Sequence, residues 1–493
     1  MERVMKLSNE QKYRLLEQAE PNELKRLYEM VEKSHWRQSY HIQPPIGLLN
    51  DPNGFTYYQG EYHLFYQWFP LGTDHGMKYW YHTKSRDLAE WEDVGIGITP
   101  GGRYDSHGAY SGSGIVKDEL LYLMYTGNTR DQDWVRHPFQ NMAVMDSSGG
   151  ITKREMPVID AVPHGYTDHF RDPKVWEQEG RYWCVIGAQR TDHTGCTVLY
   201  SSEDLMEWSF EGEISTRLDP FGYMWECPDY FELDGQGVLL FSPQGIEPQG
   251  AYYHNIYQSG YVVGAPLQLD TRSFAHGDFQ ELDRGFDFYA QQTTVAPDGR
   301  RILVGWMGLP EIDYPTDEHG WAHCLTLPRE LTLREGKLIQ RPARELERLR
   351  QEHHHAQVEL RDECVSFTGF EGSSYELLCQ FDTMDGGRFG IEFRIGTDER
   401  TVLTYDRKLR QVVLDRSRSG KPVAAEYGEQ RSCSLEADQI RFHLFVDTSS
   451  VEIFVNDGEE VFTSRIFPET DSTGIRFFAE GGTVSCEADW WKL

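Results

Sequence analysis

The sequence predicts an all-β protein with a five-bladed β-propeller, followed by an antiparallel β-sandwich and preceded by a short helical segment. Three observations predict this fold. The 493 residues include 46 Gly, 27 Tyr, 25 Phe and 13 Trp, a composition typical of many short strands joined by turns. A hairpin pattern recurs five times between residues 35 and 345. Short alternating strands then fill residues 346–493.

Residues 1–34 are predicted to form a helical extension. Their apolar residues recur with helical spacing, and Ser8 and Gln11 have the spacing of a capping box. The segment lacks the apolar centre of a secretion signal, and no run of about 18 apolar residues in the sequence would span a membrane. The eight cysteines form no CxxC pair and are typical of reduced, mostly buried thiols. We therefore expect a cytoplasmic protein without a membrane partner.

The hairpin pattern consists of an extended run, a polar turn and a strongly apolar or aromatic strand. The turns lie near Gly60, Asp118, Gly180, Gly235 and Gly299, at intervals of 58, 62, 55 and 64 residues. A hairpin unit that cannot bury its own faces must stack on copies of itself, and stacking in a circle gives a propeller. We therefore expect a propeller domain over residues 35–345.

The remaining third of the chain has a different pattern. Segments such as "SYELLCQFDT", "RFGIEFRIG" and "GIRFFAEGG" alternate apolar and polar residues, and "NDGEE" at 456–460 joins two of these strands as a hairpin. We expect a sandwich domain over residues 346–493. The three histidines at 353–355 are interpreted as a polar linker between the two domains, because no ligand partners are spaced around them.

Three acids precede hairpin turns at nearly the same distance. Asp51 lies 9 residues before Gly60, Asp172 lies 8 before Gly180, and Glu226 lies 9 before Gly235. In a propeller, the entrances of the first strands surround one central channel, so the three carboxylates should meet there. Mutual repulsion and burial would raise the pKa of at least one of them, as a general acid requires.

Three acids at matched positions have other possible roles. Acids at strand entrances often cap turns, but three at a matched position are harder to explain in that way. Oxygen ligands would suit Ca²⁺ or Mg²⁺, yet the sequence has no dense Asp/Asn loop. Phosphoryl transfer lacks a glycine-rich loop with a lysine. Carboxylates among Trp, Tyr, Gln and Asn are typical of a sugar site, and glycoside hydrolysis needs two carboxyl groups.

Motifs in order along nearly the whole chain resemble glycoside hydrolase family 32, the β-fructofuranosidases, and most resemble its bacterial members that act on sucrose 6-phosphate. They are "NDPNG" (50–54), "FYQ" (65–67), "SGS" (111–113), "RDP" (171–173), "WECPD" (225–229), "DFYAQQT" (287–293), "GWM" (305–307), "PREL" (328–331) and "SSVEIFVNDGE" (449–459). The resemblance implies release of fructose from sucrose 6-phosphate or sucrose with retained configuration. Asp51 would be the nucleophile, Glu226 the general acid and base, and Asp172 a transition-state stabiliser. The carboxyl groups of Asp51 and Glu226 would then lie about 5 Å apart.

The resemblance also implies a set of substrate contacts and no metal or other cofactor. Leu48 and Leu49 stand where relatives often have Trp-Met. Residues expected to line the fructose pocket, or to lie beside it, are Leu48, Leu49, Asn50, Gln67, Tyr110, Ser111, Arg171 and Trp306. His75 stands where many relatives have Trp, and we hypothesise that His75 and Lys78 help to bind the 6-phosphate. The alternative is that both are solvated loop residues, since lysine is usually exposed.

The sequence leaves several alternatives open. An enzyme of the same architecture that cleaves fructans, or arabinose polymers with inversion, is the second possibility, and a sugar-binding propeller without catalysis is the third. The net charge of −31 disfavours nucleic acid and anionic membranes as partners. The expected partner is therefore a small-molecule substrate. The sandwich would pack on the propeller or mediate dimerisation, so the chain is expected to be a monomer or a homodimer.

Overall fold

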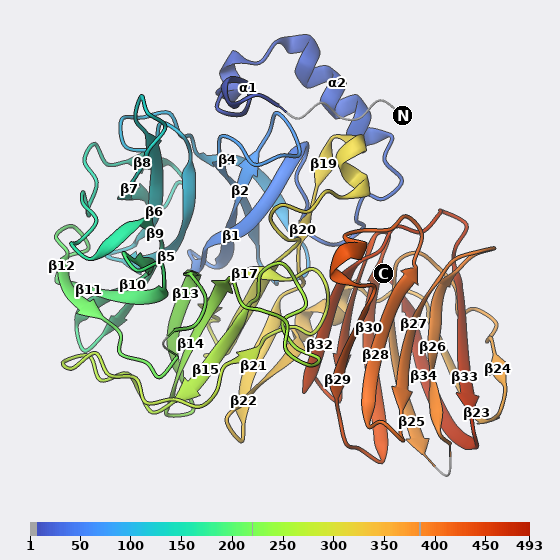
Figure 1. Cartoon of the computed structure of the whole chain (residues 1–493). Coiled ribbons are helices and arrows are strands. Elements are labelled where there is room, and N and C mark those ends of the chain that lie inside the picture. Colours follow the sequence, from blue (N-terminus) through green and yellow to red (C-terminus); the bar gives the residue numbers. More distant parts are fainter. Residues whose placement is uncertain (1–6, 219, 384–385) are drawn as a thin grey trace.

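The computed structural model describes residues 7–218, 220–383 and 386–493. Within these residues the chain forms five sheets arranged in a ring, a two-sheet sandwich beside the ring, and two short α-helices over one side of the ring (Figure 1). This arrangement confirms the predicted all-β fold. Each of the five predicted turns joins the first two strands of one ring sheet, and we call these sheets blades 1 to 5.

Most blades are antiparallel strands in sequence order. Blade 1 contains β1 (Gly47–Tyr58), β2 (Glu61–Phe69), β3 (Tyr79–Ser85) and β4 (Glu92–Ile98), with β19 (Trp321–Ala322) added parallel to β1. Blade 2 contains β5 (Ala109–Lys117), β6 (Leu120–Arg130), β7 (Arg136–Met145) and β8 (Ile151–Lys153), and blade 3 contains β9 (Tyr166–Gln178), β10 (Arg181–Arg190), β11 (Gly195–Ser202) and β12 (Ser209–Glu213). Blade 4 contains β13 (Met224–Leu233), β14 (Gln236–Gln244), β15 (Gly260–Gly264) and β16 (Gln280–Glu281), and blade 5 contains β17 (Tyr289–Val295), β18 (Arg301–Met307), β21 (Arg329–Arg334) and β22 (Lys337–Pro342), with β20 (Cys324–Leu325) paired to β18.

The ring is closed by its innermost strands. β1, β5, β9, β13 and β17 contact one another in succession, and β17 contacts β1. Apolar side chains fill the space between neighbouring blades, for example Phe65 with Leu123 and Phe231 with Leu303. Since each blade buries both of its faces, the ring gains stability from burial that no single hairpin would achieve.

All five innermost strands carry a β-bulge at the same level. In each bulge two residues oppose one residue of the second strand, and the bulged pairs are 50–51, 110–111, 172–173, 227–228 and 290–291. The three acids lie at these bulges, inside the first strands. The expectation that they lie at the strand entrances is therefore wrong for Asp51 and Asp172, because β1 and β9 begin four and six residues earlier, whereas Glu226 is the third residue of β13.

The sandwich consists of two six-stranded antiparallel sheets. One contains β23 (His353–Arg361), β34 (Thr483–Lys492), β25 (Tyr375–Thr383), β30 (Gln439–Asp447), β31 (Ser450–Val455) and β32 (Glu460–Arg465), and the other contains β24 (Cys364–Val365), β33 (Gly474–Glu480), β26 (Arg388–Ile395), β27 (Arg400–Asp406), β28 (Gln411–Arg418) and β29 (Gln430–Ser434). The residues 456–460 make the predicted turn between β31 and β32. The histidines at 353–355 begin β23, so their interpretation as a linker is wrong.

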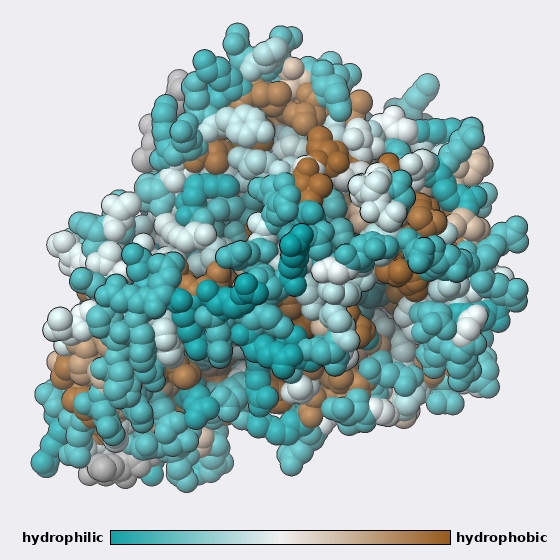
Figure 2. All heavy atoms as spheres, turned by 180° about the vertical axis from the view of Figure 1, so that it is seen from behind, coloured by the Kyte–Doolittle hydropathy of each residue, from teal (hydrophilic) through white to brown (hydrophobic). Residues whose placement is uncertain are grey.

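The N-terminal segment contains α1 (Asn9–Lys12) and α2 (Pro21–Glu32). Ser8 caps α1 and forms the predicted capping box with Gln11. Four 3₁₀ turns occur among the described residues, at Leu16–Gln18, Pro315–His319, Arg344–Leu349 and Ala425–Tyr427. None of the described helices is long and apolar enough to cross a membrane. The face in Figure 2 is mainly hydrophilic with scattered hydrophobic areas.

Candidate active site

Asp51 lies in the bulge of β1 and is held by three polar side chains. Asn50 Nδ2 donates to Oδ1 at 3.1 Å, Gln67 Nε2 donates to Oδ2 at 3.1 Å, and the Ser111 hydroxyl also donates to Oδ2. Burial raises the pKa of Asp51, the hydrogen bond from Ser111 opposes this effect, and the negative charge of Glu226 adds to it. The carboxylate therefore has a fixed orientation and a charge that the surrounding protein disfavours.

Both carboxylate oxygens of Glu226, in β13, have hydrogen-bond donors. Arg171 donates to Oε1 from Nε at 2.8 Å and from Nη2 at 2.5 Å. Gln244 Nε2 donates to Oε2 at 2.8 Å, and the Tyr289 hydroxyl donates to the same oxygen at 2.5 Å. The side chain remains 15% exposed, so a ligand in the central channel can reach it.

Asp172 connects the first two acids through Cys227. The Cys227 backbone N–H donates to Asp172 Oδ2 at 3.1 Å, and its Sγ lies 3.9 Å from Asp51 Oδ2. Cys227 also directly follows Glu226, so all three acids surround one residue. Burial raises the pKa of Asp172 to about 7; Arg171 lowers it, and the charges of Glu226 and Asp51 raise it.

The three acids are thus brought together although their positions in the strand ladders differ. Asp51 is the second residue of its bulge, Asp172 is the first of its bulge, and Glu226 immediately precedes its bulge. Asp172 and Cys227 have φ angles of 69° and 48°, which non-glycine residues rarely adopt. The bulges therefore turn the three carboxylates toward one another, although the acids occupy different positions in their strand ladders.

Asp51 is held by a buried network of hydrogen bonds that begins at Lys78. Lys78 Nζ donates to Asn50 Oδ1 at 2.7 Å, Asn50 Nδ2 donates to Gln67 Oε1 at 3.0 Å, and Gln67 Nε2 donates to Ser111 Oγ at 2.5 Å. Lys78 is only 2% exposed, so the alternative that it is a solvated loop residue is wrong. Burial lowers the pKa of Lys78 to about 7, against the effect of the negative charge of Asp51.

His75 lies apart from this network. It is exposed within a cavity of about 420 Å³ and its ring centroid is 6.1 Å from that of the buried Trp306. Leu48 also lines this cavity, whereas Leu49 is fully buried in the core and nothing in its surroundings supports a substrate contact. The other lining residues are Lys12, Thr73, Asp74, Leu309, Glu311, Ile312, Asp313 and His323.

The last of the predicted contacts, Tyr110, is the first residue of the β5 bulge. Its hydroxyl accepts a hydrogen bond from Asn128 Nδ2 at 3.2 Å, and the guanidinium carbon of Arg136 lies 5.8 Å from its ring centroid. No group of three or more His, Cys, Asp or Glu side chains among the described residues is arranged to hold a metal ion.

Sequence reasoning missed three residues that organise the acids. Tyr289 belongs to the motif "DFYAQQT", but the motif alone did not indicate its hydrogen bond to Glu226. Gln244 ends the apolar β14 and faces Met224 across the ladder, a pairing that only the register reveals. Cys227 acts through its backbone N–H, so its residue type gives no signal.

Two family descriptions match the chain. "Glycosyl hydrolases family 32 N-terminal domain" matches residues 41–342, and "Glycosyl hydrolases family 32 C terminal" matches residues 345–492. The sucrose-6-phosphate hydrolase of Staphylococcus xylosus is 47% identical over 475 residues, which cover 96% of each chain. That of Bacillus subtilis (strain 168) is 44% identical over 458 residues, covering 90% of this chain and 93% of the relative.

Solved structures agree with this similarity over both domains. A sucrose-6-phosphate hydrolase from Lactobacillus gasseri superposes with a TM-score of 0.92, at 35% identity and 99% coverage of each chain. A β-fructofuranosidase from Bombyx mori, solved in complex with sucrose, has a TM-score of 0.83 at 33% identity, covering 94% of this chain and 96% of its own. The chain therefore belongs to the glycosyl hydrolases of family 32.

Proposed function

We propose that the protein is a retaining β-fructofuranosidase that releases fructose from sucrose 6-phosphate and sucrose. The observation that carries this proposal is the gathering of Asp51, Asp172 and Glu226 around Cys227 in the centre of the ring. Retaining hydrolysis needs one ionised carboxylate and one proton-donating carboxyl group at the same bond. The sucrose-6-phosphate hydrolases among the relatives support the choice of substrate.

In the first step of the proposed reaction, Asp51 attacks the anomeric carbon of the fructosyl unit. The glycosidic bond breaks as the Glu226 carboxyl group gives its proton to the leaving oxygen, and a covalent fructosyl-enzyme forms. In the second step, Glu226 takes a proton from water, and the resulting hydroxide displaces Asp51 from the anomeric carbon. Fructose is released, and both carboxyl groups return to their starting protonation states.

The remaining residues hold these groups in place in this proposal. Asn50, Gln67 and Ser111 fix the Asp51 carboxylate through three hydrogen bonds, so that little reorganisation precedes the attack. Asp172 accepts hydrogen bonds from hydroxyl groups of the fructosyl unit and stabilises positive charge at the anomeric carbon. Two carboxyl groups and water complete the chemistry, so the proposal names no metal or other cofactor.

Several predictions from the sequence accompany this proposal. The protein acts in the cytoplasm on a small-molecule substrate, as a monomer or a homodimer. Its domains are a helical extension of residues 1–34, a catalytic propeller of residues 35–345 and a sandwich of residues 346–493. The role of His75 and Lys78 in binding the 6-phosphate stays a prediction.

Replacing the general acid tests the reaction. Glu226→Gln keeps the acceptor for Arg171 but has no proton to donate, so kcat for sucrose should fall by roughly 10²- to 10⁴-fold while binding persists. The measurement is kcat together with sucrose binding by calorimetry. Glu232→Gln, on the exposed part of the same strand, is the matched control and should keep activity.

Three outcomes would contradict the proposal. Hydrolysis at the normal rate by the Glu226→Gln variant would remove the general acid from the mechanism. Release of fructose with inverted configuration, observed by NMR in the first seconds of the reaction, would exclude the covalent intermediate on Asp51. Hydrolysis of neither sucrose nor its 6-phosphate by the unmodified enzyme would overturn the function itself.

A further inference from the structure

Arg136 is a partly buried cation beside the active site that has no carboxylate partner. It begins β7, and its guanidinium carbon lies 5.8 Å from the ring centroid of Tyr110. Tyr110 is in the β5 bulge next to Ser111, which bonds Asp51. Among the residues that the structure describes, the Arg136 side chain has neither a salt bridge nor a hydrogen bond. Apart from its place over the Tyr110 ring, this partly buried cation has no anionic partner, which is costly unless a ligand supplies the missing charge.

Arg130 lies directly opposite Arg136 in the β6–β7 ladder. Two like charges in this position repel each other and destabilise the pair. Arg130 Nη1 donates to the Trp134 backbone carbonyl at 2.8 Å, but its buried Nε has no partner. The tip of this hairpin therefore holds two arginines whose hydrogen-bonding groups are incompletely used. Its two acids bond neither arginine: Asp131 pairs with His137 at 3.0 Å, and Asp133 is exposed.

Arg171 adds a third positive charge near the Arg130–Arg136 pair, on the side where Glu226 lies. The charges that act most strongly on Arg136, besides the Tyr110 hydroxyl, belong to Arg171, Arg130 and Glu226. His169 adds no charge, because burial and the charges of Arg171 and Arg136 lower its pKa to about 4, and its Nδ1 lies 3.1 Å from Arg171 Nη1. Glu226 accepts two hydrogen bonds from Arg171 and makes no ion pair with Arg136 among the described residues.

The cavity at His75 has the opposite character. Its lining includes Asp74, Glu311 and Asp313, and its one lysine, Lys12, already pairs with Asp74 at 3.1 Å. Lys78 donates to Asn50 underneath Asp51 and so supports the catalytic carboxylate. Three carboxylates around His75 would repel a phosphate group, whereas the Arg130–Arg136 pair would attract one.

On the basis of the proposed function, we propose that Arg136, assisted by Arg130, binds the phosphate group of the leaving sugar phosphate. Glu226 donates its proton to the leaving oxygen, so the glucosyl 6-phosphate departs on the side of the ring where these arginines lie. The planar guanidinium of Arg136 offers several donors to phosphate oxygens. In a protein with a net charge of −31, such a local positive patch is needed to attract an anionic substrate.

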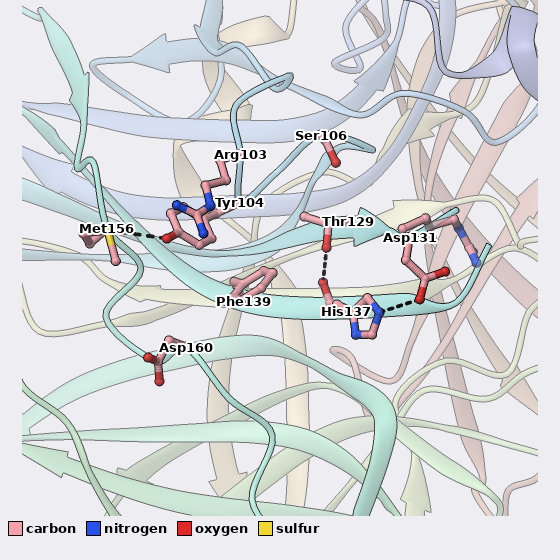
Figure 3. A pocket seen from close by; sticks show the side chains of 10 residues that line it. Arg103, Tyr104, Ser106, Thr129, Asp131, His137, Phe139, Met156 and Asp160 are labelled. Carbon is pink, nitrogen blue, oxygen red and sulfur yellow. Dashed lines mark hydrogen bonds and ion pairs between the residues drawn. The ribbon is translucent and has the colours of Figure 1, made fainter. Parts of the chain in front are cut away.

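The test compares kcat/KM for sucrose 6-phosphate and for sucrose in Arg136→Gln. A charge-assisted hydrogen bond to the phosphate predicts that the ratio of the two values falls by roughly 10- to 100-fold. The matched control is Arg103→Gln, which removes the same charge from a cavity of about 390 Å³ (Figure 3) that Arg130 also lines but Arg136 does not. Arg103 is exposed and also has no salt bridge among the described residues, and its replacement should leave the ratio unchanged.

A third variant separates this site from the one at His75. Lys78→Ala should lower kcat for both substrates alike, because Lys78 positions Asn50; a selective rise in KM for sucrose 6-phosphate would instead place the phosphate near His75. An unchanged ratio in Arg136→Gln would overturn the inference and leave the proposed function standing. Glucose 6-phosphate should also inhibit the unmodified enzyme at least ten-fold more strongly than glucose. Equal inhibition would likewise overturn it, even if Arg136→Gln failed to fold.

Discussion

At the scale of single residues, the active site depends on backbone conformations that the sequence does not reveal. The spacing of the three acids from the hairpin turns predicted which carboxylates belong together. It did not predict the bulges, because β1, β9 and β13 are mostly buried on both faces around them, so the extra residue breaks no alternation of apolar and polar residues. Asp172 and Cys227 adopt positive φ angles although neither is glycine. Such conformations persist where the surrounding structure enforces them, and they cluster at functional sites.

The raised pKa of Asp172 makes stability depend on pH. Its pKa of about 7 in the folded protein exceeds the ordinary value of 3.8, so the folded state holds the proton more tightly. The stability from this group is complete below pH 3.8 and is lost as the pH rises through 7. Asp172→Asn removes this loss and should stabilise the protein at pH 8 by up to about 4 kcal/mol, at about 1.4 kcal/mol per pKa unit.

Thermal unfolding at pH 4, 6 and 8 measures this effect. The gain in unfolding temperature of Asp172→Asn should be largest at pH 8 and should vanish toward pH 4. The variant should also lose its activity. Asp168→Asn is the matched control on the same strand and should show no gain that grows with pH. A gain of equal size at all three pH values would contradict the electrostatic origin.

At the scale of elements, the five hairpins were predictable because each one joins two long patterned strands. The strands β19 and β20 were not, since two residues carry no detectable period. The sequence indicated helices at the N-terminus but gave no sign of where they lie. The segment around α1 packs on the loop before β3: Met77 N–H donates to the Lys12 carbonyl at 2.7 Å, and Leu16 N–H donates to the Tyr79 hydroxyl at 2.8 Å. Lys12 thereby becomes part of the cavity at His75.

Gly76 allows this close approach. A Cβ added there would lie 2.5 Å from the Lys12 carbonyl oxygen and 2.8 Å from the Phe69 ring. Gly76→Ala should therefore displace the N-terminal segment, at a cost typical of overpacking, about 1–3 kcal/mol. We expect a lower unfolding temperature and faster hydrogen exchange in residues 7–20.

Gly277→Ala is the control for this substitution. A Cβ at Gly277 would meet no atom closer than the Val263 carbonyl oxygen at 3.5 Å, and its backbone needs no positive φ. This variant should match the unmodified protein in every measurement. Protection of residues 7–20 that stays unchanged in Gly76→Ala would show that the segment is not held by this contact.

At the scale of the whole molecule, the ring and the sandwich are joined by buried charged groups. Ser39 and His41, which precede β1, bond Asp447 of the sandwich, and His41 also approaches Glu452 at 3.1 Å. Arg329 of blade 5 bonds Glu452 as well. The sequence left the role of the sandwich open between packing and dimerisation. The structure shows the packing, and its charged partners come from segments hundreds of residues apart that no local pattern links.

Arg329 occupies the centre of this junction and has no exposed surface. It donates to Glu452 Oε2 from Nη2 at 2.6 Å and from Nε at 3.1 Å, and to Asp283 Oδ2 at 3.1 Å. Burial raises the pKa of Glu452, but Arg329 and His41 outweigh burial and hold it below its ordinary value of 4.5. Arg329→Met leaves two buried carboxylates without this cation, which costs about 3–5 kcal/mol.

The unfolding temperature of Arg329→Met should therefore fall by several degrees at pH 7.5. Because the stability from Glu452 is present above pH 4.5 and lost as the pH falls below it, the difference from the unmodified protein should shrink in acid. Arg344→Met breaks an exposed pair with Asp298 and should cost no more than about 1 kcal/mol. If Arg329→Met were no more harmful than Arg344→Met at pH 7.5, the charged junction would not hold the two domains together, and the apolar contacts between them would have to do so alone.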